Sequence, residues 1–204
     1  MSLFRKLTAK PWEHAGELEG PHGEILARHS AAWTGLTLFL LVISSLFGLF
    51  MVSYYSRSRF ADWEVLAEPV ILWVNTVVLA LASIALQRAS NAASRNDRAA
   101  MRKSVIAGAV LTLAFIGGQS AAWVQLVAAG HYLQVNPSFA FFYLLTGVHA
   151  LHLAGGLWYL GRLGFRMSQP GGGESLLRSL RLGATYWHYL LLVWLAMFAL
   201  LLMT

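Results

Sequence analysis

Five stretches of apolar residues, each long enough to cross a bilayer as a helix, follow one another along the chain. They cover residues 32–55, 69–87, 104–129, 138–160 and 183–203. None of them contains Asp, Glu, Lys or Arg, and a helix needs about 20 apolar residues to span the hydrocarbon core. The pattern therefore predicts an all-α, polytopic membrane protein. We expect a polar N-terminal segment, 1–31, followed by a bundle of five transmembrane helices within 32–204.

Basic residues are concentrated in the segments that would lie on one side of such a bundle. Thirteen of the fifteen Lys and Arg residues lie before the first stretch, between the second and third, or between the fourth and fifth. They are Arg5, Lys6, Lys10, Arg28, Arg88, Arg95, Arg98, Arg102, Lys103, Arg162, Arg166, Arg178 and Arg181. Because cytoplasmic loops carry the excess of Lys and Arg, we expect a cytoplasmic N-terminus and a C-terminus on the outer side.

Composition agrees with this assignment and excludes several classes of protein. Hydrophobic residues make up 57% of the 204 residues and charged residues 12%, against about 25% charged residues in soluble domains. A soluble enzyme and a disordered chain are therefore excluded. The chain has no Cys, so it has neither disulfides nor thiolate metal sites. The net charge of +6 lies in the basic loops, where it suits anionic lipid headgroups, and it does not indicate nucleic-acid binding.

A few polar side chains interrupt the apolar stretches. They include Asn75, Thr76, Gln119, Thr146, His149, His152 and His188. Interhelical hydrogen bonds in membranes contribute about 0.6 kcal/mol on average, and such bonds are the simplest explanation for Asn75, Gln119 and Thr146. Small residues at four-residue spacing, such as Gly118 and Ala122, indicate closely packed helices.

The histidines leave two further functions open. His149 and His152 are three residues apart, so both can point to one helix face. Together with His188 they could bind a metal or a haem iron, which would make the chain an electron carrier. Intramembrane ionisable groups also mark ion pathways, so a small transporter is the second alternative. No carboxylate lies in the stretches to complete a metal site or a relay. We therefore expect no catalytic, metal-binding or cofactor-binding residue in this chain.

The N-terminal segment contains three more histidines, His14, His22 and His29. We expect them to belong to a solvated tail on the inner surface rather than to a metal site.

The last two stretches carry specific sequence motifs. FFYLLTGVHALHLAGGL, residues 141–157, closely resembles the LTG-x-HGxH segment of subunit III of the haem-copper terminal oxidases. YWHYLLLVWL, residues 186–195, resembles the YWHFVDVVWL segment of the same family. The resemblance extends to Asn75–Thr76 in the second stretch and to Gln119 and Trp123 in the third. The order of the motifs also agrees with the short, five-helix bacterial form of that subunit.

Three carboxylates that are usual in the family are missing. The Glu of the first helix aligns near Ile43 or Ser44, the Glu of the LQAYEW segment aligns with Ala122, and the Asp of YWHFVD aligns with Leu191. The chain therefore resembles a divergent member. An accessory membrane protein of a nitric oxide reductase system, which resembles the same family, is a third alternative.

The resemblance implies a non-catalytic subunit of a cytochrome c or quinol oxidase in the bacterial cytoplasmic (inner) membrane. By analogy, the haem and copper that reduce oxygen to water would lie in partner subunits. This chain would pack against subunit I and other subunits, support proton uptake and bind phospholipid. The candidates for packing or lipid contact are Asn75, Thr76, Gln119, Trp123, Thr146, His149, His152, Tyr186, Trp187, His188 and Trp194.

Overall fold

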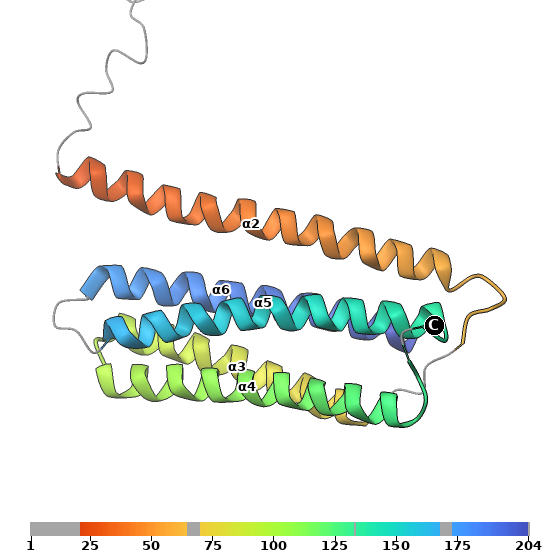
Figure 1. Cartoon of the computed structure of the whole chain (residues 1–204). Helices are drawn as coiled ribbons and strands as arrows, with labels where there is room; N and C mark the ends of the chain where they lie inside the picture. Colours follow the sequence, from red (N-terminus) through yellow and green to blue (C-terminus); the bar gives the residue numbers. More distant parts are fainter. Residues whose placement is uncertain (1–20, 65–69, 133, 168–172, 204) are drawn as a thin grey trace, which may run out of the picture. The chain divides into compact units, whose positions relative to one another are not determined.

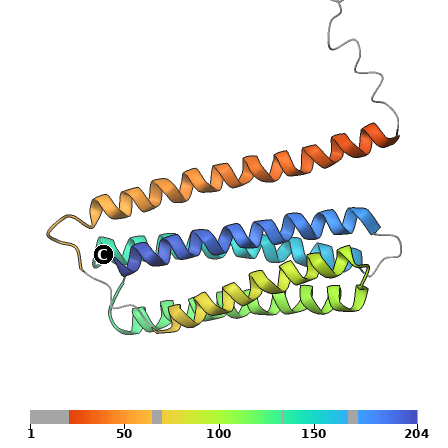
Figure 2. The same cartoon turned by 180° about the vertical axis from the view of Figure 1, so that it is seen from behind.

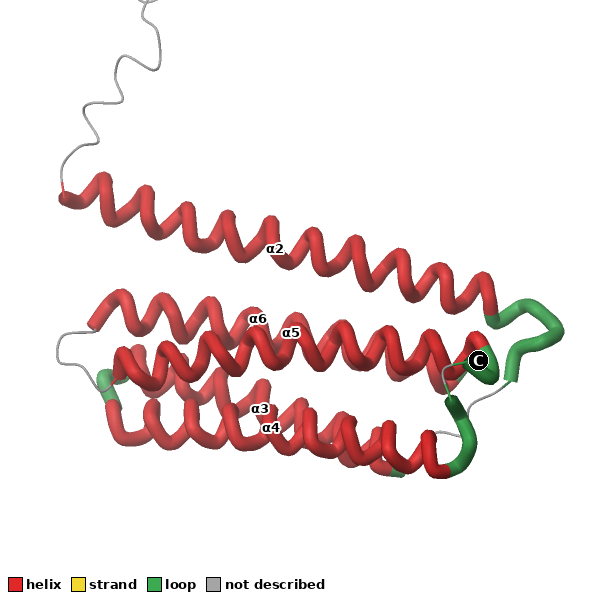
Figure 3. The backbone as a smooth tube through the Cα atoms, in the orientation of Figure 1, coloured by secondary structure: helices red, strands yellow, loops and turns green. Residues whose placement is uncertain are grey.

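The computed structural model describes residues 21–64, 70–132, 134–167 and 173–203, with side chains from residue 31 in the first range and from residue 175 in the last. These residues form five helices and no strand (Figures 1 and 3). The helices are α2 Pro21–Arg57, α3 Ile71–Ser94, α4 Arg98–Ala128, α5 Pro137–Met167 and α6 Gly173–Leu202. Each contains a segment that is long and apolar enough to cross a membrane. The predictions of an all-α fold and of five membrane-spanning helices are confirmed.

The helices extend beyond the predicted apolar stretches, mainly at their basic ends. α3 ends at Ser94 instead of residue 87, and α4 begins at Arg98 instead of residue 104. The predicted stretches stop at the first charged residue, whereas Lys and Arg side chains can extend from a helix end toward the headgroups. α2 also begins early, at Pro21, because proline is well tolerated in the first turn of a helix. The predicted start of the second span, Pro69, lies outside the described residues.

The chain divides into two compact units, Met1–Leu41 and Val42–Thr204. In the first unit the described residues form the first half of α2, where the Thr37 hydroxyl donates to the Trp33 carbonyl at 2.9 Å. The second unit contains the rest of α2 and helices α3 to α6. Within it, α3 packs against α4 and α6, and α5 packs against the same two helices (Figures 1 and 2). These four helices therefore form a closed ring in which neighbours in the chain run antiparallel.

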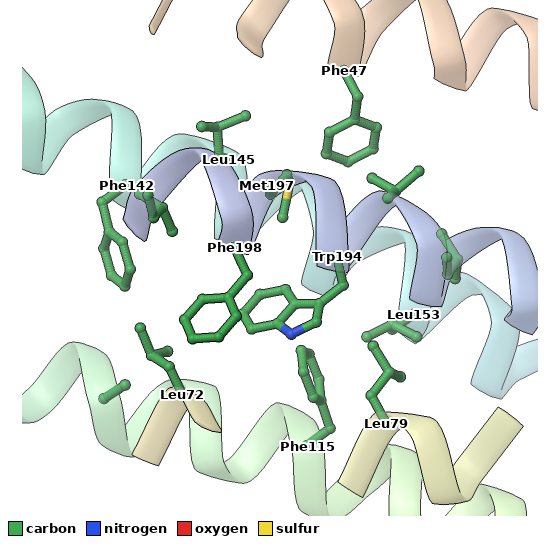
Figure 4. Close-up of a cluster of buried hydrophobic side chains, with 14 of the residues drawn as sticks. Phe47, Leu72, Leu79, Phe115, Phe142, Leu145, Leu153, Trp194, Met197 and Phe198 are labelled. Carbon is green, nitrogen blue, oxygen red and sulfur yellow. The ribbon is translucent and has the colours of Figure 1, made fainter. Parts of the chain in front are cut away.

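A cluster of buried aromatic and aliphatic side chains fills the core of the second unit (Figure 4). The Trp194 ring meets Phe115 edge-to-face, with ring centroids 4.9 Å apart, and stacks on Phe198 at 6.2 Å. Ile43 and Phe47 of α2 belong to the same cluster. Offset and edge-to-face arrangements are the favourable geometries for aromatic pairs. The cluster contains buried side chains from α2, α3, α4, α5 and α6 and so joins all five helices.

The outward faces of the helices carry large apolar side chains. Leu151 is 70% exposed, Val124 68% and Leu192 64%. Soluble monomers rarely expose continuous apolar surface of this kind, whereas hydrocarbon tails solvate it without cost. The exposure pattern and the length of the helices together indicate a multi-pass membrane protein.

The α3–α4 turn and the beginning of α6 lie at the same end of the ring (Figures 1 and 2). In the turn, Asn96 has a φ of 57°, a left-handed conformation that Asn tolerates better than most residues. Asp97 then caps α4, because its carboxylate accepts a hydrogen bond from the Ala100 backbone N–H at 2.9 Å. This end of the ring therefore gathers the arginines that flank the two connections.

An ion pair and a hydrogen bond from a side-chain amide stabilise the loop at the opposite end of the four-helix ring. The Arg57 guanidinium donates to both carboxylate oxygens of Asp62, and this bond lowers the pKa of the Asp62 carboxyl. The pair therefore stabilises the loop above the ordinary carboxyl pKa and is lost as the pH falls through the lowered value. The Asn136 side chain donates to the Asp62 carbonyl at 2.9 Å. The loop after α2 is thus tied to the beginning of α5.

Candidate functional site

Tryptophan and threonine side chains connect the helices of the ring at three places. In each pair the indole N–H donates to a threonine hydroxyl on another helix. The pairs are Trp194–Thr76 between α6 and α3 at 2.9 Å, Trp187–Thr112 between α6 and α4 at 3.0 Å, and Trp123–Thr146 between α4 and α5 at 3.1 Å. Indole is only a donor, so a tryptophan in an apolar layer needs an acceptor. In each pair the threonine hydroxyl supplies this acceptor to the tryptophan N–H.

Each of the three threonines also bonds to its own helix. The hydroxyls donate to the carbonyl four residues earlier, at 2.9 Å for Thr76, 2.8 Å for Thr112 and 2.6 Å for Thr146. A hydroxyl carries one donor and two acceptor lone pairs, so one group serves both its own helix and the neighbouring indole. Thr76, Thr146, Trp123, Trp187 and Trp194 were candidates from sequence. Thr112 was missed, although a threonine inside an apolar stretch was the available signal.

Two buried amides meet between α3 and α4. The Asn75 Nδ2 lies 3.4 Å from the Gln119 Oε1, and both side chains are buried. Gly118 makes this approach possible, because a Cβ there would lie 2.1 Å from the Asn75 Oδ1. The candidates Asn75 and Gln119 thus form a direct interhelical contact that depends on a glycine.

His149 lies inside the aromatic cluster. It is 0% exposed, and its ring centroid lies 5.4 Å from Trp194, 5.8 Å from Phe115 and 6.2 Å from Phe47. Among the residues that the structure describes, neither ring nitrogen has a hydrogen-bond partner. The local environment is that of an apolar core position rather than that of a ligand.

His152 lies three residues further along α5 and has different contacts. Its Nδ1 lies 2.7 Å from the Val148 carbonyl, and its own carbonyl accepts a hydrogen bond from the Tyr186 hydroxyl at 3.0 Å. Both histidine rings lie near Phe47. His152 and Tyr186 therefore join α5 to α6 at this level.

Trp187, next to Tyr186, packs against α5 where that helix has a glycine. A Cβ at Gly156 would lie 2.7 Å from the Trp187 ring. The candidate Trp187 is 0% exposed. Its ring packs against α5, and its N–H donates to Thr112 of α4.

His188 forms part of a polar ladder between α6 and α3. Its Nδ1 lies 2.5 Å from the Ser83 Oγ, and its Nε2 lies 3.1 Å from the Gln87 Oε1. Gln87 in turn donates to the Asn91 Oδ1 at 3.1 Å. Since an amide oxygen can only accept, Nε2 carries the proton in the neutral imidazole and Nδ1 accepts from Ser83. Ser83, Gln87 and Asn91 were not candidates from sequence, but their i, i+4, i+8 spacing places them on one face of α3.

The positions at which the sequence resemblance places the three missing carboxylates are occupied by apolar residues and one serine. Ile43 and Ala122 lie in the buried aromatic cluster, and Leu191 is half-buried beside it. Ser44 lies 2.8 Å from the Tyr189 hydroxyl. Burial of an unpaired carboxylate is costly, so the apolar residues suit the environment that this chain provides.

The three predicted intramembrane histidines do not share one site. His149 lies in the aromatic cluster, His152 bonds to backbone, and His188 bonds to α3. Within the described ranges, no group of three or more His, Cys, Asp or Glu side chains could hold a metal ion. His14 lies outside the described residues, and so do the side chains of His22 and His29 in α2.

An open cavity of about 470 Å³ lies on the outer face of α5 near its basic end. It is lined by Trp158, Gly161, Arg162, Phe165 and Arg166. The Arg162 guanidinium lies over the Trp158 ring, 4.9 Å from its centroid. Cationic groups beside exposed aromatic rings are typical of the membrane interface, because side chains at that level contact both the lipid headgroups and the acyl chains.

The fold and these contacts define a polytopic membrane protein whose intramembrane polar groups mostly connect its own helices. The family model for cytochrome c oxidase subunit III matches residues 13–203. The chain is 29% identical over 191 residues to cytochrome c oxidase subunit 3 of Synechocystis sp., covering 91% of this chain and 79% of that relative. It is also 29% identical over 172 residues to the corresponding subunit of Thermostichus vulcanus, covering 82% and 84%.

A third relative is a probable quinol oxidase subunit 3 of Staphylococcus haemolyticus, 23% identical over 170 residues, with 80% of this chain and 84% of the relative covered. The chain belongs to the cytochrome c oxidase subunit III family. It is therefore a subunit of a respiratory oxidase, as its sequence motifs indicated.

Proposed function

We propose that the chain is the non-catalytic subunit III of a bacterial haem-copper oxidase in the cytoplasmic membrane. In this proposal it packs directly against subunit I, and the haem and copper that reduce oxygen to water lie in partner subunits. The observation that carries the proposal is the family match, which extends over all five spans. The use of Trp, Thr, Asn and Gln side chains for contacts between helices of this chain supports a structural rather than a chemical role.

The candidate residues from sequence act, in this proposal, by holding the bundle in one geometry. Two of the three Trp–Thr pairs connect α6 to α3 and α4, and the third connects α4 to α5. The ring of four helices then presents a rigid surface to the rest of the oxidase. By stabilising subunit I, the bundle supports proton uptake into the complex from the cytoplasmic side.

Phospholipid is the second expected partner. The cavity on α5 supports this part of the proposal, because Arg162 and Arg166 offer positive charge beside the exposed Trp158 and Phe165 side chains. An anionic headgroup would lie against the guanidinium groups, and the acyl chain would follow the apolar face of α5.

The orientation that we propose has the N-terminus in the cytoplasm and the C-terminus outside. This orientation is supported by the position of two connections in the fold. The α3–α4 turn and the beginning of α6 lie at the same end of the ring, and arginines flank both of them. Cysteine labelling tests it directly, because the chain has no native Cys. A membrane-impermeant maleimide should label Met203→Cys in intact spheroplasts and should label Asn96→Cys only after lysis.

Affinity purification in mild detergent tests the main proposal. The tagged chain should recover a large polypeptide whose reduced-minus-oxidised spectrum shows haem. A copy of the tagged chain with Gly118→Leu, which cannot pack α3 on α4, serves as the matched control and should recover little of it. Recovery of the intact wild-type chain without any haem-bearing polypeptide would sink the proposal.

A further inference from the structure

The second half of α2, residues 42–57, meets the four-helix ring along a narrow row of side chains. Its buried residues are Ile43, Phe47 and Tyr54, and Figure 4 shows Phe47 extending from α2 toward the buried cluster. The other sides of this segment are open, since Leu49 is 68% exposed and Val52 is 64% exposed. Residues 42–57 are therefore attached to the ring by one edge of the helix.

The helices of the ring are packed much more closely than this. Cα atoms of neighbouring ring helices approach within 8 Å of one another, whereas those of residues 42–57 come this close to none of the described ring helices. The three Trp–Thr pairs and the Asn75–Gln119 contact also join ring helices to each other. In a membrane, close packing and interhelical hydrogen bonds hold helices together. The contacts that stabilise the ring therefore do not require α2.

Two contacts connect α2 to the ring near its middle. The Ser44 hydroxyl lies 2.8 Å from the Tyr189 hydroxyl of α6. The Phe47 ring lies 5.6 Å from the His152 ring and 6.2 Å from the His149 ring, both on α5. Each contact is made by the ends of side chains. Neither brings the backbone of α2 against a ring helix.

A closed set of three aromatic side chains, Tyr54, Trp63 and Phe141, connects the C-terminal end of α2 to α5. We call this set the aromatic clasp. Tyr54 is 3% exposed and meets Trp63 edge-to-face, with ring centroids 4.9 Å apart, and meets Phe141 edge-to-face at 5.9 Å. Trp63 lies 6.5 Å from Phe141. Each ring therefore contacts the other two at favourable distances for aromatic pairs.

Hydrogen bonds in the loop after α2 position Trp63 in the clasp. The Trp63 backbone N–H donates to the Phe60 carbonyl at 3.1 Å. The Asn136 side chain donates to the Asp62 carbonyl at 2.9 Å, and its Oδ1 accepts from the Ser138 backbone N–H at 2.9 Å. The loop is thus fixed to the beginning of α5 beside the clasp.

We propose that the aromatic clasp controls whether α2 lies on the ring. While the clasp is closed, α2 is held at its C-terminal end and near its middle. When the clasp opens, α2 separates from the ring and the four ring helices stay folded, which is a local opening of the least closely packed element. The inference concerns contacts within this chain, so it does not depend on the proposed function.

Pairs of nitroxide spin labels on the full chain in lipid nanodiscs test the inference. Because the chain has no native Cys, Leu49→Cys with Leu113→Cys reports the distance between α2 and α4, and Leu113→Cys with Leu192→Cys reports a distance within the ring. All three side chains are more than half exposed. In Trp63→Ala the fraction of long α2–α4 distances should rise about tenfold, as expected for the loss of two aromatic contacts. The α4–α6 distances should not change.

Three further variants separate the clasp from other effects. Phe60→Ala is the matched control, because it removes a 62% exposed ring from the same loop outside the clasp, and it should leave both distances unchanged. Trp63→Phe keeps an aromatic ring and should retain most of the closed form. Asn136→Asp keeps the oxygen that accepts from Ser138 but removes the N–H that donates to Asp62, so it should also increase the long α2–α4 distances.

Other results would overturn the inference. If neither Trp63→Ala nor Asn136→Asp increases the long α2–α4 distances, the clasp does not hold α2. If the α4–α6 distances change as well, or if Trp63→Ala does not fold, α2 and the ring form one cooperative unit. An equal effect of Phe60→Ala would assign the change to the loop as a whole and not to the aromatic clasp.

Discussion

The indole nitrogen of Trp194 lies 2.9 Å from the Thr76 hydroxyl, and that hydroxyl lies 2.9 Å from the Leu72 carbonyl of its own helix. A single hydroxyl therefore satisfies the only polar atom of a fully buried tryptophan without leaving its own proton unpaired. The same arrangement recurs at Thr112 and Thr146. In a bilayer, where helices gain nothing from hiding apolar surface from water, such contacts and close packing hold the bundle together.

Replacement of Thr76 by Val tests the importance of this contact. Valine keeps the shape of the side chain but removes the acceptor, so the Trp194 N–H is left unpaired in an apolar layer. We expect the free energy of unfolding to fall by about 1 to 2 kcal/mol. The measurement is the unfolding of the purified chain in SDS, followed by circular dichroism.

Thr76→Ser is the matched control, because it keeps the hydroxyl and loses only a methyl group. It should lose less than half of what Thr76→Val loses. Equal losses for the two variants would show that packing, and not the hydrogen bond, stabilises this position.

Gly118 and Gly117 offer a direct comparison of two adjacent glycines on α4. An added Cβ at Gly118 would lie 2.1 Å from the Asn75 Oδ1, whereas at Gly117 it meets no atom within 4 Å. Gly118→Ala should therefore cost about 1 to 3 kcal/mol through overpacking, and Gly117→Ala should be neutral or slightly stabilising, since Ala favours the helix. SDS unfolding of both variants makes the comparison.

Removal of the side chain that blocks the new methyl group should restore stability. Asn75→Ala combined with Gly118→Ala should unfold at a higher SDS concentration than Gly118→Ala alone. If the double variant is no more stable than the single one, the loss at Gly118 has another cause than contact with Asn75.

Much of this architecture could be predicted from the sequence because bilayer thickness and loop charge act on composition alone. The five spans followed from uninterrupted apolar stretches. The helix ends were placed too far inward, since the predicted spans stopped at charged residues such as Arg88 and Arg162 while the helices continue through them. Charge marks the membrane boundary, and the backbone hydrogen bonds of a helix do not end there.

The candidate site could be predicted only in part, because sequence shows which residues are polar but not which residues they meet. The sequence predicted interhelical bonds for Asn75 and Gln119, and in the structure the Asn75 Nδ2 lies 3.4 Å from the Gln119 Oε1, 44 residues further along the chain. His149 and His152 were grouped by their spacing, yet the former lies among aromatic rings and the latter bonds to backbone. Gln87 was missed because it is the last residue of its predicted span, next to Arg88, where polar residues are common.

Ala122 is the position at which a carboxylate should harm this chain most. It is 0% exposed and lies in the aromatic cluster. Ala122→Glu both overpacks the core and buries an unpaired carboxyl group, so we expect little folded protein in the membrane. Ala122→Met has a similar volume without the carboxyl. Folded yields of the two variants, measured by size-exclusion chromatography in detergent, should differ clearly, and equal yields would contradict a specific cost of the carboxyl.

His149 tests whether a fully buried imidazole without hydrogen bonds contributes to stability. Because neither ring nitrogen has a partner among the described residues, its burial carries a desolvation cost that a hydrocarbon side chain does not. We expect His149→Leu to leave the free energy of unfolding unchanged or to raise it by about 1 kcal/mol, with assembly of the oxidase unaffected. His152→Leu is the comparison, since it removes the contact between Nδ1 and the Val148 carbonyl and should not be stabilising. Loss of more than about 2 kcal/mol in His149→Leu, or loss of haem from the purified complex, would show that His149 has a partner in the assembled oxidase.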